Sequence, residues 1–149
     1  MGVALCEAEK ALELNEIPIG AVVVCNGTPI ARAHNMTEVL RDVTAHAEMQ
    51  AFTAAADWMG GKYLRECTLY VTLQPCPMCA GAAYWTQIGR VVYGATDLKH
   101  AHIDRNPLYH PKTTVVGGVL EDECAALLQR FFEGKRGKGG KTESRANNI

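Results

Sequence analysis

The chain has 149 residues, a formal net charge of −1 and a hydrophobic fraction of 48%. This length accommodates one domain with a substantial core, and this composition excludes disorder over most of the chain. No apolar run approaches the roughly 18 residues that span a bilayer, and the chain does not open with a basic segment followed by an apolar one. We therefore expect a cytoplasmic protein with no membrane association. The near-neutral charge does not by itself indicate a nucleic-acid-binding protein.

The first half of the chain predicts a helix, a hairpin and a second helix. Apolar residues at helical spacing predict the first helix over Val3–Leu14. Two β-branched segments, Ile19–Val24 and Pro29–Ala33, flank an Asn-Gly pair at positions 26 and 27, a strong hairpin signal. After a loop over 34–43, an alanine-rich helix begins near Thr44, the expected N-cap, and ends at Gly60.

The second half alternates strands with helices. In chain order the predicted elements are a strand over Thr68–Leu73, a helix over Ala80–Thr86, a strand over Arg90–Gly94, an irregular loop over His100–Lys112, a strand over Thr113–Val116 and a helix over Glu121–Phe132. Alternation of this kind is typical of an α/β domain, here a mixed central sheet of about five strands between two layers of helices. The strand-to-helix units predict right-handed parallel crossovers, and the hairpin must be antiparallel.

The end of the chain differs in composition from the rest. We expect one folded domain over 1–134 and a basic, Gly/Lys-rich tail over 135–149, with Gly134 and Gly137 interrupting the end of the last helix. Charge alone favours a solvated tail over one that contacts phosphates. No internal repeat is apparent.

The six cysteines fall into two groups. Four stand singly among apolar neighbours and are expected to be buried free thiols: Cys6, Cys25, Cys67 and Cys124. Cys76 and Cys79 instead form a C-x-x-C directly after Pro75. A chain of this size with so many core residues does not need a disulfide framework, so this pair indicates metal or redox chemistry.

The C-x-x-C pair combines with a His-x-Glu pair at His46 and Glu48. A catalytic zinc takes three protein ligands and leaves one position for water, and His46, Cys76 and Cys79 supply that number. Glu48 is then free to take a proton from zinc-bound water, so that the hydroxide attacks the ring carbon that carries an amine. The combination is the signature of zinc-dependent base deaminases.

Helix geometry restricts where these side chains can meet. Residues two apart on a regular helix point about 200° away from each other, so His46 and Glu48 can share a site only above a helix N-terminus. Cys76 and Cys79, three apart, lie on one helix face, and a helix N-terminus stabilises thiolates. Both motifs follow predicted strands or loops and open helices, which is where ligand sites of α/β sheets lie.

Other interpretations of the motifs remain open. A C-x-x-C alone is also typical of structural zinc sites and of thioredoxin-like redox pairs, and a His-x-Glu alone carries almost no information. A structural zinc site would normally have four protein ligands, and no fourth partner is obvious. A redox pair would leave His46 and Glu48 without a role.

With these motifs in view, the chain resembles the cytidine/deoxycytidylate deaminase superfamily and, more closely, bacterial tRNA-specific adenosine deaminases. The resemblance runs from about Ala4 to Phe132. It is carried by Glu16-Ile-Pro-Ile-Gly-Ala-Val-Val-Val, Thr44-Ala-His-Ala-Glu, Leu69-Tyr-Val-Thr-Leu, Pro75-Cys-Pro-Met-Cys-Ala-Gly-Ala and Ile88-Gly-Arg-Val-Val-Tyr-Gly-Ala-Thr-Asp. It implies a three-layer cytidine-deaminase-like fold and a zinc-dependent deaminase domain over 1–134.

The resemblance also implies a substrate and partners. The expected reaction converts adenosine to inosine at the wobble position of a tRNA anticodon, in a homodimer with one zinc per chain. The target base would be splayed out of its loop into the pocket. By position, Asn35 matches a residue that contacts the substrate nucleoside, and Asp97 and Lys99 match a segment near the RNA backbone. Lys135 and Arg136 fall where the family has basic residues.

The chain departs from the family pattern at several positions. Gln74 stands where the family usually has Glu before Pro-Cys, and the loop from His100 to His110 is unusual. The aromatic pair Tyr84-Trp85 resembles guanine deaminases. A deaminase of guanine, cytidine or dCMP is therefore the alternative enzyme, and a catalytically silent nucleic-acid-binding protein or zinc-stabilised scaffold is the alternative from another class. Retention of Glu48 argues against the last two, because a structural site has no use for it.

Overall fold

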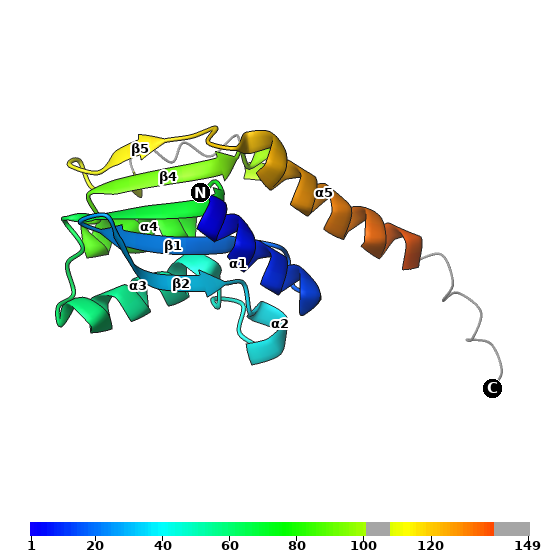
Figure 1. The fold of residues 1–149 in the computed structure, drawn as a ribbon, viewed down its shortest axis with the longest axis horizontal. Helices are drawn as coiled ribbons and strands as arrows, with labels where there is room; N and C mark the ends of the chain where they lie inside the picture. The colour runs from blue at the N-terminus through cyan, green and yellow to red at the C-terminus, as the bar shows by residue number, and fades with distance from the viewer. Residues whose placement is uncertain (101–107, 139–149) are drawn as a thin grey trace.

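The computed structural model describes residues 1–100 and 108–138. A five-stranded sheet in the order β2-β1-β3-β4-β5 forms its centre (Figure 1). The strands are β1 Gly20–Cys25, β2 Thr28–His34, β3 Cys67–Leu73, β4 Arg90–Ala95 and β5 Thr114–Val116. The helices are α1 Gly2–Glu13, α2 Thr37–Leu40, α3 Ala47–Met59, α4 Pro77–Thr86, the 3-10 turn η1 Leu98–His100 and α5 Glu121–Lys138. Most of the predicted irregular loop, 101–107, and residues 139–149 lie outside the described residues.

Strand pairing confirms the predicted mixed sheet. β1 pairs antiparallel with β2 and with β3, whereas β3 with β4 and β4 with β5 are parallel. The β1–β2 turn has Asn26 and Gly27 at positive φ, 48° and 78°, which is the backbone that a tight hairpin turn requires. The carboxyl ends of β3 and β4 therefore lie at the same edge of the sheet.

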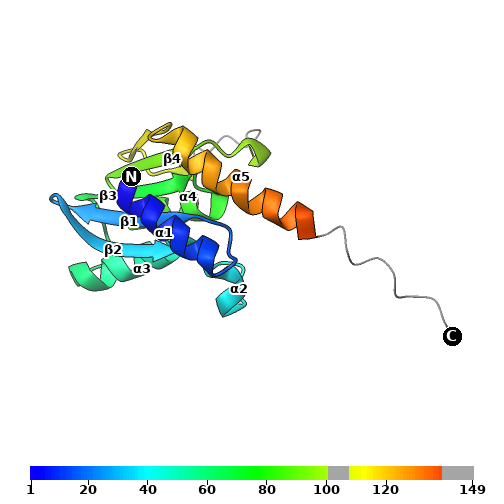
Figure 2. The ribbon, with the colours of Figure 1, turned by 45° about the vertical axis from the view of Figure 1, so that its right-hand side comes forward.

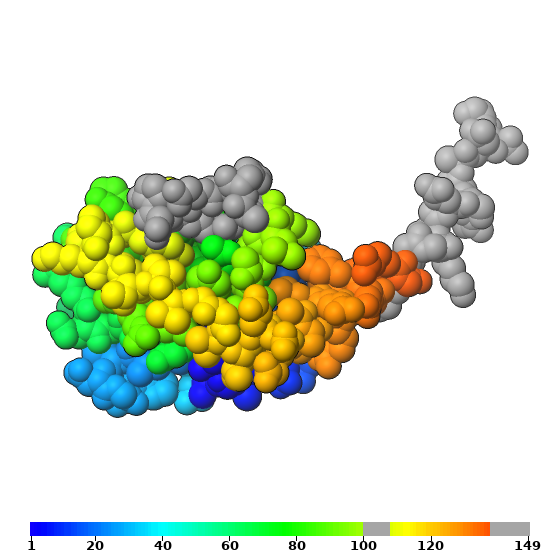
Figure 3. Space-filling view, turned by 90° about the horizontal axis from the view of Figure 1, so that it is seen from above, coloured from blue at the N-terminus to red at the C-terminus, as the bar shows by residue number. Residues whose placement is uncertain are grey.

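Helices cover both faces of the sheet, as predicted (Figure 2). On one face, Val23 and Val71 belong to a core that includes Ala51 and Phe52 of α3 together with two alanines of α4. On the opposite face α1 lies so close to β1 that a Cβ on Gly20 would collide with the Ala4 carbonyl. α5 covers β4 on this second face, and its last turns extend past the body of the domain (Figure 3).

Several local expectations were wrong. The expected loop over 34–43 contains the short helix α2, and α4 begins at Pro77 instead of Ala80. The N-cap of α3 is His46, because the Thr44 hydroxyl donates to Asp42 Oδ1 at 2.7 Å and is not available for capping. α5 continues through Gly134 and Gly137, since a glycine in a helix costs only about 1 kcal/mol.

Burial of the isolated cysteines is confirmed for three of the four. Cys25, Cys67 and Cys124 are buried free thiols, whereas Cys6 is exposed on the outer side of α1. Its neighbours Ala4, Ala8 and Ala11 take the buried face of that helix instead.

Across the part of the chain that the structure describes, no helix combines the length and apolar character needed to cross a bilayer.

Candidate active site

The candidate site forms where two helices begin beside the carboxyl ends of the strands. His46 caps α3 with φ −70° and ψ 152°, and Cys76 caps α4 with φ −68° and ψ 170°. Because both residues have extended backbone, their side chains are not bound by the angular spacing of a helix. Glu48 lies in the first turn of α3. These residues therefore lie at the two helix N-termini, where the sequence places them.

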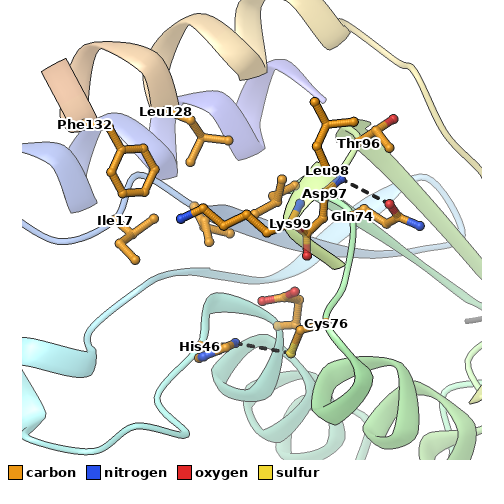
Figure 4. A pocket seen from close by; sticks show the side chains of 13 residues that line it. Ile17, His46, Gln74, Cys76, Thr96, Asp97, Leu98, Lys99, Leu128 and Phe132 are labelled. Carbon is orange, nitrogen blue, oxygen red and sulfur yellow. Dashed lines mark hydrogen bonds between the residues drawn. The ribbon is translucent and has the colours of Figure 1, made fainter. Parts of the chain in front are cut away.

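Three of the predicted residues come together in ligand geometry. His46 Nδ1 lies 3.7 Å from Cys76 Sγ and 3.5 Å from Cys79 Sγ (Figure 4 shows the first of these). Zinc bonds of about 2.3 Å to sulfur and 2.05 Å to nitrogen, at a tetrahedral angle, separate the two ligand atoms by about 3.6 Å. All three ligand atoms lie within 4.8 Å of one another. The donor set and its spacing therefore fit one tetrahedral ion.

The group leaves a coordination position open. Within residues 1–100 and 108–138, no fourth His, Cys, Asp or Glu atom joins the three. Structural zinc sites are closed by four protein ligands, whereas catalytic ones keep one position for water or substrate. The geometry thus favours the catalytic kind of site over the structural kind.

The electrostatics of the group favour a cation. Hydrogen bonding with Cys79, and next with His46, lowers the pKa of Cys76 to about 4. The hydrogen bond with Cys76 raises the pKa of His46. A separate hydrogen bond between Cys79 and Cys76, together with burial, raises the pKa of Cys79. Cys76 is therefore favoured as a thiolate, and thiolate sulfur together with imidazole nitrogen is a ligand set suited to a divalent ion.

Glu48 is a buried carboxyl group with a free oxygen. Its side chain is 3% exposed, and Oε2 has no hydrogen-bond partner among the described residues. Burial raises the pKa of Glu48 to about 7. A buried acceptor without a partner is unfavourable by about 1–3 kcal/mol. This oxygen is therefore suited to accept a hydrogen bond or a proton from a water molecule or a substrate. A pKa near neutrality is also what a group that both accepts and returns a proton requires.

The site opens into a cavity of about 360 Å³ with two contrasting walls (Figure 4). His46, Glu48 and Cys76 form the polar wall. The facing wall is largely apolar and comes from the α1–β1 loop, the segment after β4, and α5: Ile17, Leu98, Leu128 and Phe132. Ile19, a core residue, also lines the cavity. No sequence motif marks these apolar residues as part of a site. Helical periodicity predicts that one face of α5 is apolar, but it does not indicate that part of this face borders a cavity.

The three predicted substrate-contacting residues are placed differently. Asp97 and Lys99 line the cavity, and Lys99 Nζ lies 4.7 Å from the centre of the Phe132 ring. Asn35 is not among the lining residues. It is 2% exposed, its backbone N–H donates to the carbonyl of Ile19 at 3.0 Å, and its Oδ1 has no partner among the described residues. Asn35 thus lies next to a wall residue and keeps one buried acceptor free.

Gln74 takes part in the site through a hydrogen bond. Its side-chain Oε1 accepts from the backbone N–H of Asp97 at 3.1 Å. Its backbone N–H donates to the Ala95 carbonyl at 2.9 Å. The residue therefore joins the segment after β3 to the segment after β4. Its amide oxygen serves this purpose as a carboxylate oxygen would, without a negative charge beside the thiolates.

Comparisons with known proteins agree with this geometry. The family model of the MafB19-like deaminases matches residues 1–136. The tRNA-specific adenosine deaminase of Bacillus subtilis is 45% identical over 141 residues, which cover 91% of this chain and 88% of the relative.

Solved structures extend the comparison. One, from a study of A-to-I editing by tRNA:A34 deaminases at the wobble position, matches with a TM-score of 0.79 and 41% identity, over 86% of this chain and 97% of that one. A guanine deaminase from Nitrosomonas europaea matches with a TM-score of 0.76 but 26% identity, over 87% and 81%. The chain therefore belongs to the MafB19-like deaminases and, among them, to the tRNA-specific adenosine deaminase family of the cytidine/deoxycytidylate deaminase superfamily.

Proposed function

We propose that this protein hydrolyses the exocyclic amine of adenosine at the wobble position of a tRNA anticodon, giving inosine and ammonia. The observation that carries the chemistry is the three-ligand group beside the unpartnered oxygen of Glu48, at the wall of the cavity that His46, Glu48 and Cys76 line. The substrate follows from the relatives, since the tRNA-specific enzymes match at 45% identity and the guanine deaminase at 26%.

Zinc is the proposed ion, held by His46, Cys76 and Cys79. When bound, it would lower the pKa of a water molecule toward neutrality and so supply a nucleophile. Glu48 accepts the proton from this water, for which its free Oε2 is available. The protonated carboxyl group then donates to the ring nitrogen beside the reacting carbon and, in a second transfer, to the departing amine. The apolar wall of Leu128 and Phe132 limits water around the base.

Two sets of substrate contacts are proposed. The amide of Asn35, which keeps an unpartnered oxygen, would bind the nucleoside, while Asp97 and Lys99 would lie near the RNA backbone. A base inside a helical stack cannot reach an enclosed site, so the adenosine would be splayed out of the anticodon loop. The basic tail over 135–149, beyond the deaminase domain over 1–134, would add contacts to phosphates.

We also propose a homodimer in the cytoplasm. Trp58 at the end of α3 and Trp85 at the end of α4 are 61% and 76% exposed, and Tyr63 and Tyr84 are partly exposed as well. Exposed aromatic side chains of this size are typical of protein interfaces. Sedimentation of the purified protein, compared with a Trp85→Glu variant, would measure the contribution of this surface.

Guanine deamination is the second candidate. The fold match to a guanine deaminase and the Tyr84-Trp85 pair favour it, although Trp85 is exposed and neither residue lines the cavity. A guanine deaminase needs no RNA surface and would act readily on the free base.

A substrate panel separates the candidates. Zinc-loaded protein is incubated with an anticodon stem-loop carrying adenosine at the wobble position, and separately with guanine, cytidine and dCMP, with and without a chelator. We expect inosine from the RNA only, and none after zinc removal. Xanthine or uridine without inosine would reverse the assignment.

A further inference from the structure

A fully buried carboxyl group outside the catalytic cluster holds the segment that joins two site residues. Glu16 is 0% exposed and lies between α1 and β1. Its Oε1 accepts from the backbone N–H groups of Glu38 at 2.8 Å and Val39 at 2.9 Å, and its Oε2 accepts from the Thr37 hydroxyl at 3.1 Å. All three donors belong to α2. This helix has no capping side chain of its own, so Glu16 satisfies its first N–H groups from another part of the chain.

The segment that Glu16 holds has a functional residue at each end. It runs from Asn35 to His46, and its two ends are joined where Met36 N–H donates to the Ala45 carbonyl at 3.0 Å. The Gln50 amide donates to the carbonyls of His34 at 2.8 Å and Ala45 at 3.2 Å. The base of the loop is thus fixed to α3, whereas its outer part rests on Glu16.

The outer part of the loop has little else to hold it. Val39, Leu40 and Val43 are 50%, 54% and 85% exposed, and no residue of α2 is buried. Hydrophobic burial therefore contributes little to its position, and the hydrogen bonds to a buried carboxyl group are the main constraint. Loss of those bonds would release the outer part of the loop and leave its two ends held only by the hydrogen bonds at its base.

We infer that Glu16 is a positioning residue that keeps Asn35 and His46 in place for substrate and metal by anchoring the outer part of the 35–46 loop. The inference rests on the proposed function for the role of Asn35 and His46, but the anchoring itself is a property of the fold. Glu16 touches neither the cavity nor the metal group.

The side-chain geometry makes Glu16→Gln an instructive variant. Both N–H donors bind Oε1, which an amide oxygen can replace, and the amide NH₂ can donate to the Thr37 hydroxyl, which also accepts. Glu16→Gln should therefore preserve the anchor. Glu16→Ala removes all three hydrogen bonds. Glu16→Asp keeps a carboxyl group, but its side chain is one methylene too short to reach the donors of α2.

The test measures the loop, the metal and the RNA separately. In Glu16→Ala we expect the amides of residues 38 and 39 to lose protection from hydrogen exchange, zinc affinity to fall about tenfold and KM for the RNA to rise about tenfold. Glu16→Gln should stay within about threefold of the parent protein in each measurement. Thr113→Val is the matched control, because it removes a 2.6 Å hydrogen bond to the Ile88 carbonyl, a residue that does not line the cavity. It should lower stability without changing zinc affinity or KM.

Clear outcomes would overturn the inference. Unchanged exchange, zinc affinity and KM in Glu16→Ala would do so, as would an equal loss in Thr113→Val of matched stability. If Glu16→Ala does not fold, the order of the other two variants decides: the inference requires Glu16→Gln to exceed Glu16→Asp in zinc affinity, and the reverse order contradicts it. Hydrogen exchange and zinc affinity remain informative even if the parent protein does not deaminate RNA, so failure of the proposed function is recognised separately.

Discussion

The two walls of the cavity are built in different ways. Glu48 of the polar wall is 3% exposed, and Cys79, which belongs to the metal group but does not line the cavity, is 0% exposed. Both rest on helices that pack against the sheet. On the facing wall, Leu98 is 81% exposed, and Phe132 belongs to α5, whose last turns extend past the sheet (Figure 1). The groups that carry the proposed chemistry are therefore held by the core, whereas Leu98 and α5 of the facing wall lie nearer the surface. Reaction chemistry and substrate choice can accordingly be altered independently.

The largest expected effect comes from the metal group beside the polar wall. Cys79→Ala removes one of the three proposed ligands, so the protein should retain far less than one zinc per chain and no measurable activity. Elemental analysis of the purified variant checks this. Cys124→Ala is the matched control, because Cys124 is an equally buried thiol on the other face of the sheet. Full zinc content in Cys79→Ala would contradict the assignment of the ligands.

The next effect separates proton transfer from metal binding. Glu48→Gln should keep zinc and fold but lower kcat for the RNA by about 10²–10⁴, which is the usual contribution of general acid–base catalysis. Single-turnover rates and zinc content are measured on the same sample. The control is Glu13→Gln at an exposed position of α1. An active Glu48→Gln enzyme would show that another group moves the proton.

A smaller effect is expected from the facing, apolar wall of the cavity. Phe132→Ala should raise KM for the RNA about tenfold, within the 1–3 kcal/mol typical of aromatic contacts to a base, with kcat and zinc content nearly unchanged. Phe131 provides the control, since it is also half-buried but does not line the cavity. A large fall in kcat with unchanged KM would mean that the two walls are not independent.

The smallest effect lies away from both walls and concerns stability. Burial opposes ionisation of Glu7, but hydrogen bonds from Lys10 at 2.7 Å and with His34 at 2.9 Å outweigh it and lower the pKa of Glu7 below its ordinary 4.5. A lowered folded-state pKa contributes stability above the ordinary value that is lost as the pH falls through the folded value. Glu7→Gln should therefore reduce the free energy of unfolding by about 1 kcal/mol at pH 7 and by less below pH 4.

Urea unfolding at a series of pH values checks this prediction. The difference in free energy of unfolding between the parent protein and Glu7→Gln should shrink as the pH falls. A difference that grows instead would contradict the lowered pKa of Glu7. Activity per folded molecule should not change, because Glu7 lies outside the cavity.

Much of the fold was predictable because its signals are local. Alternation of strands and helices, the Asn-Gly turn and the helix stop at Gly60 all depend on neighbouring residues, and all are confirmed. The errors arose where a distant or competing partner decides. Thr44 does not cap α3 because Asp42 takes its hydroxyl, and α2 forms where a loop was expected because a carboxyl group some twenty residues earlier caps it.

The same distinction holds for the site. By itself the sequence determined the candidate ligands and the catalytic carboxyl group, because their chemistry and spacing at two helix openings leave few other arrangements. Only the tertiary structure decided the apolar wall, the bond from Asp97 to Gln74 and the support of the loop by Glu16. These features join residues far apart in the chain, and no local pattern specifies which distant side chains will meet.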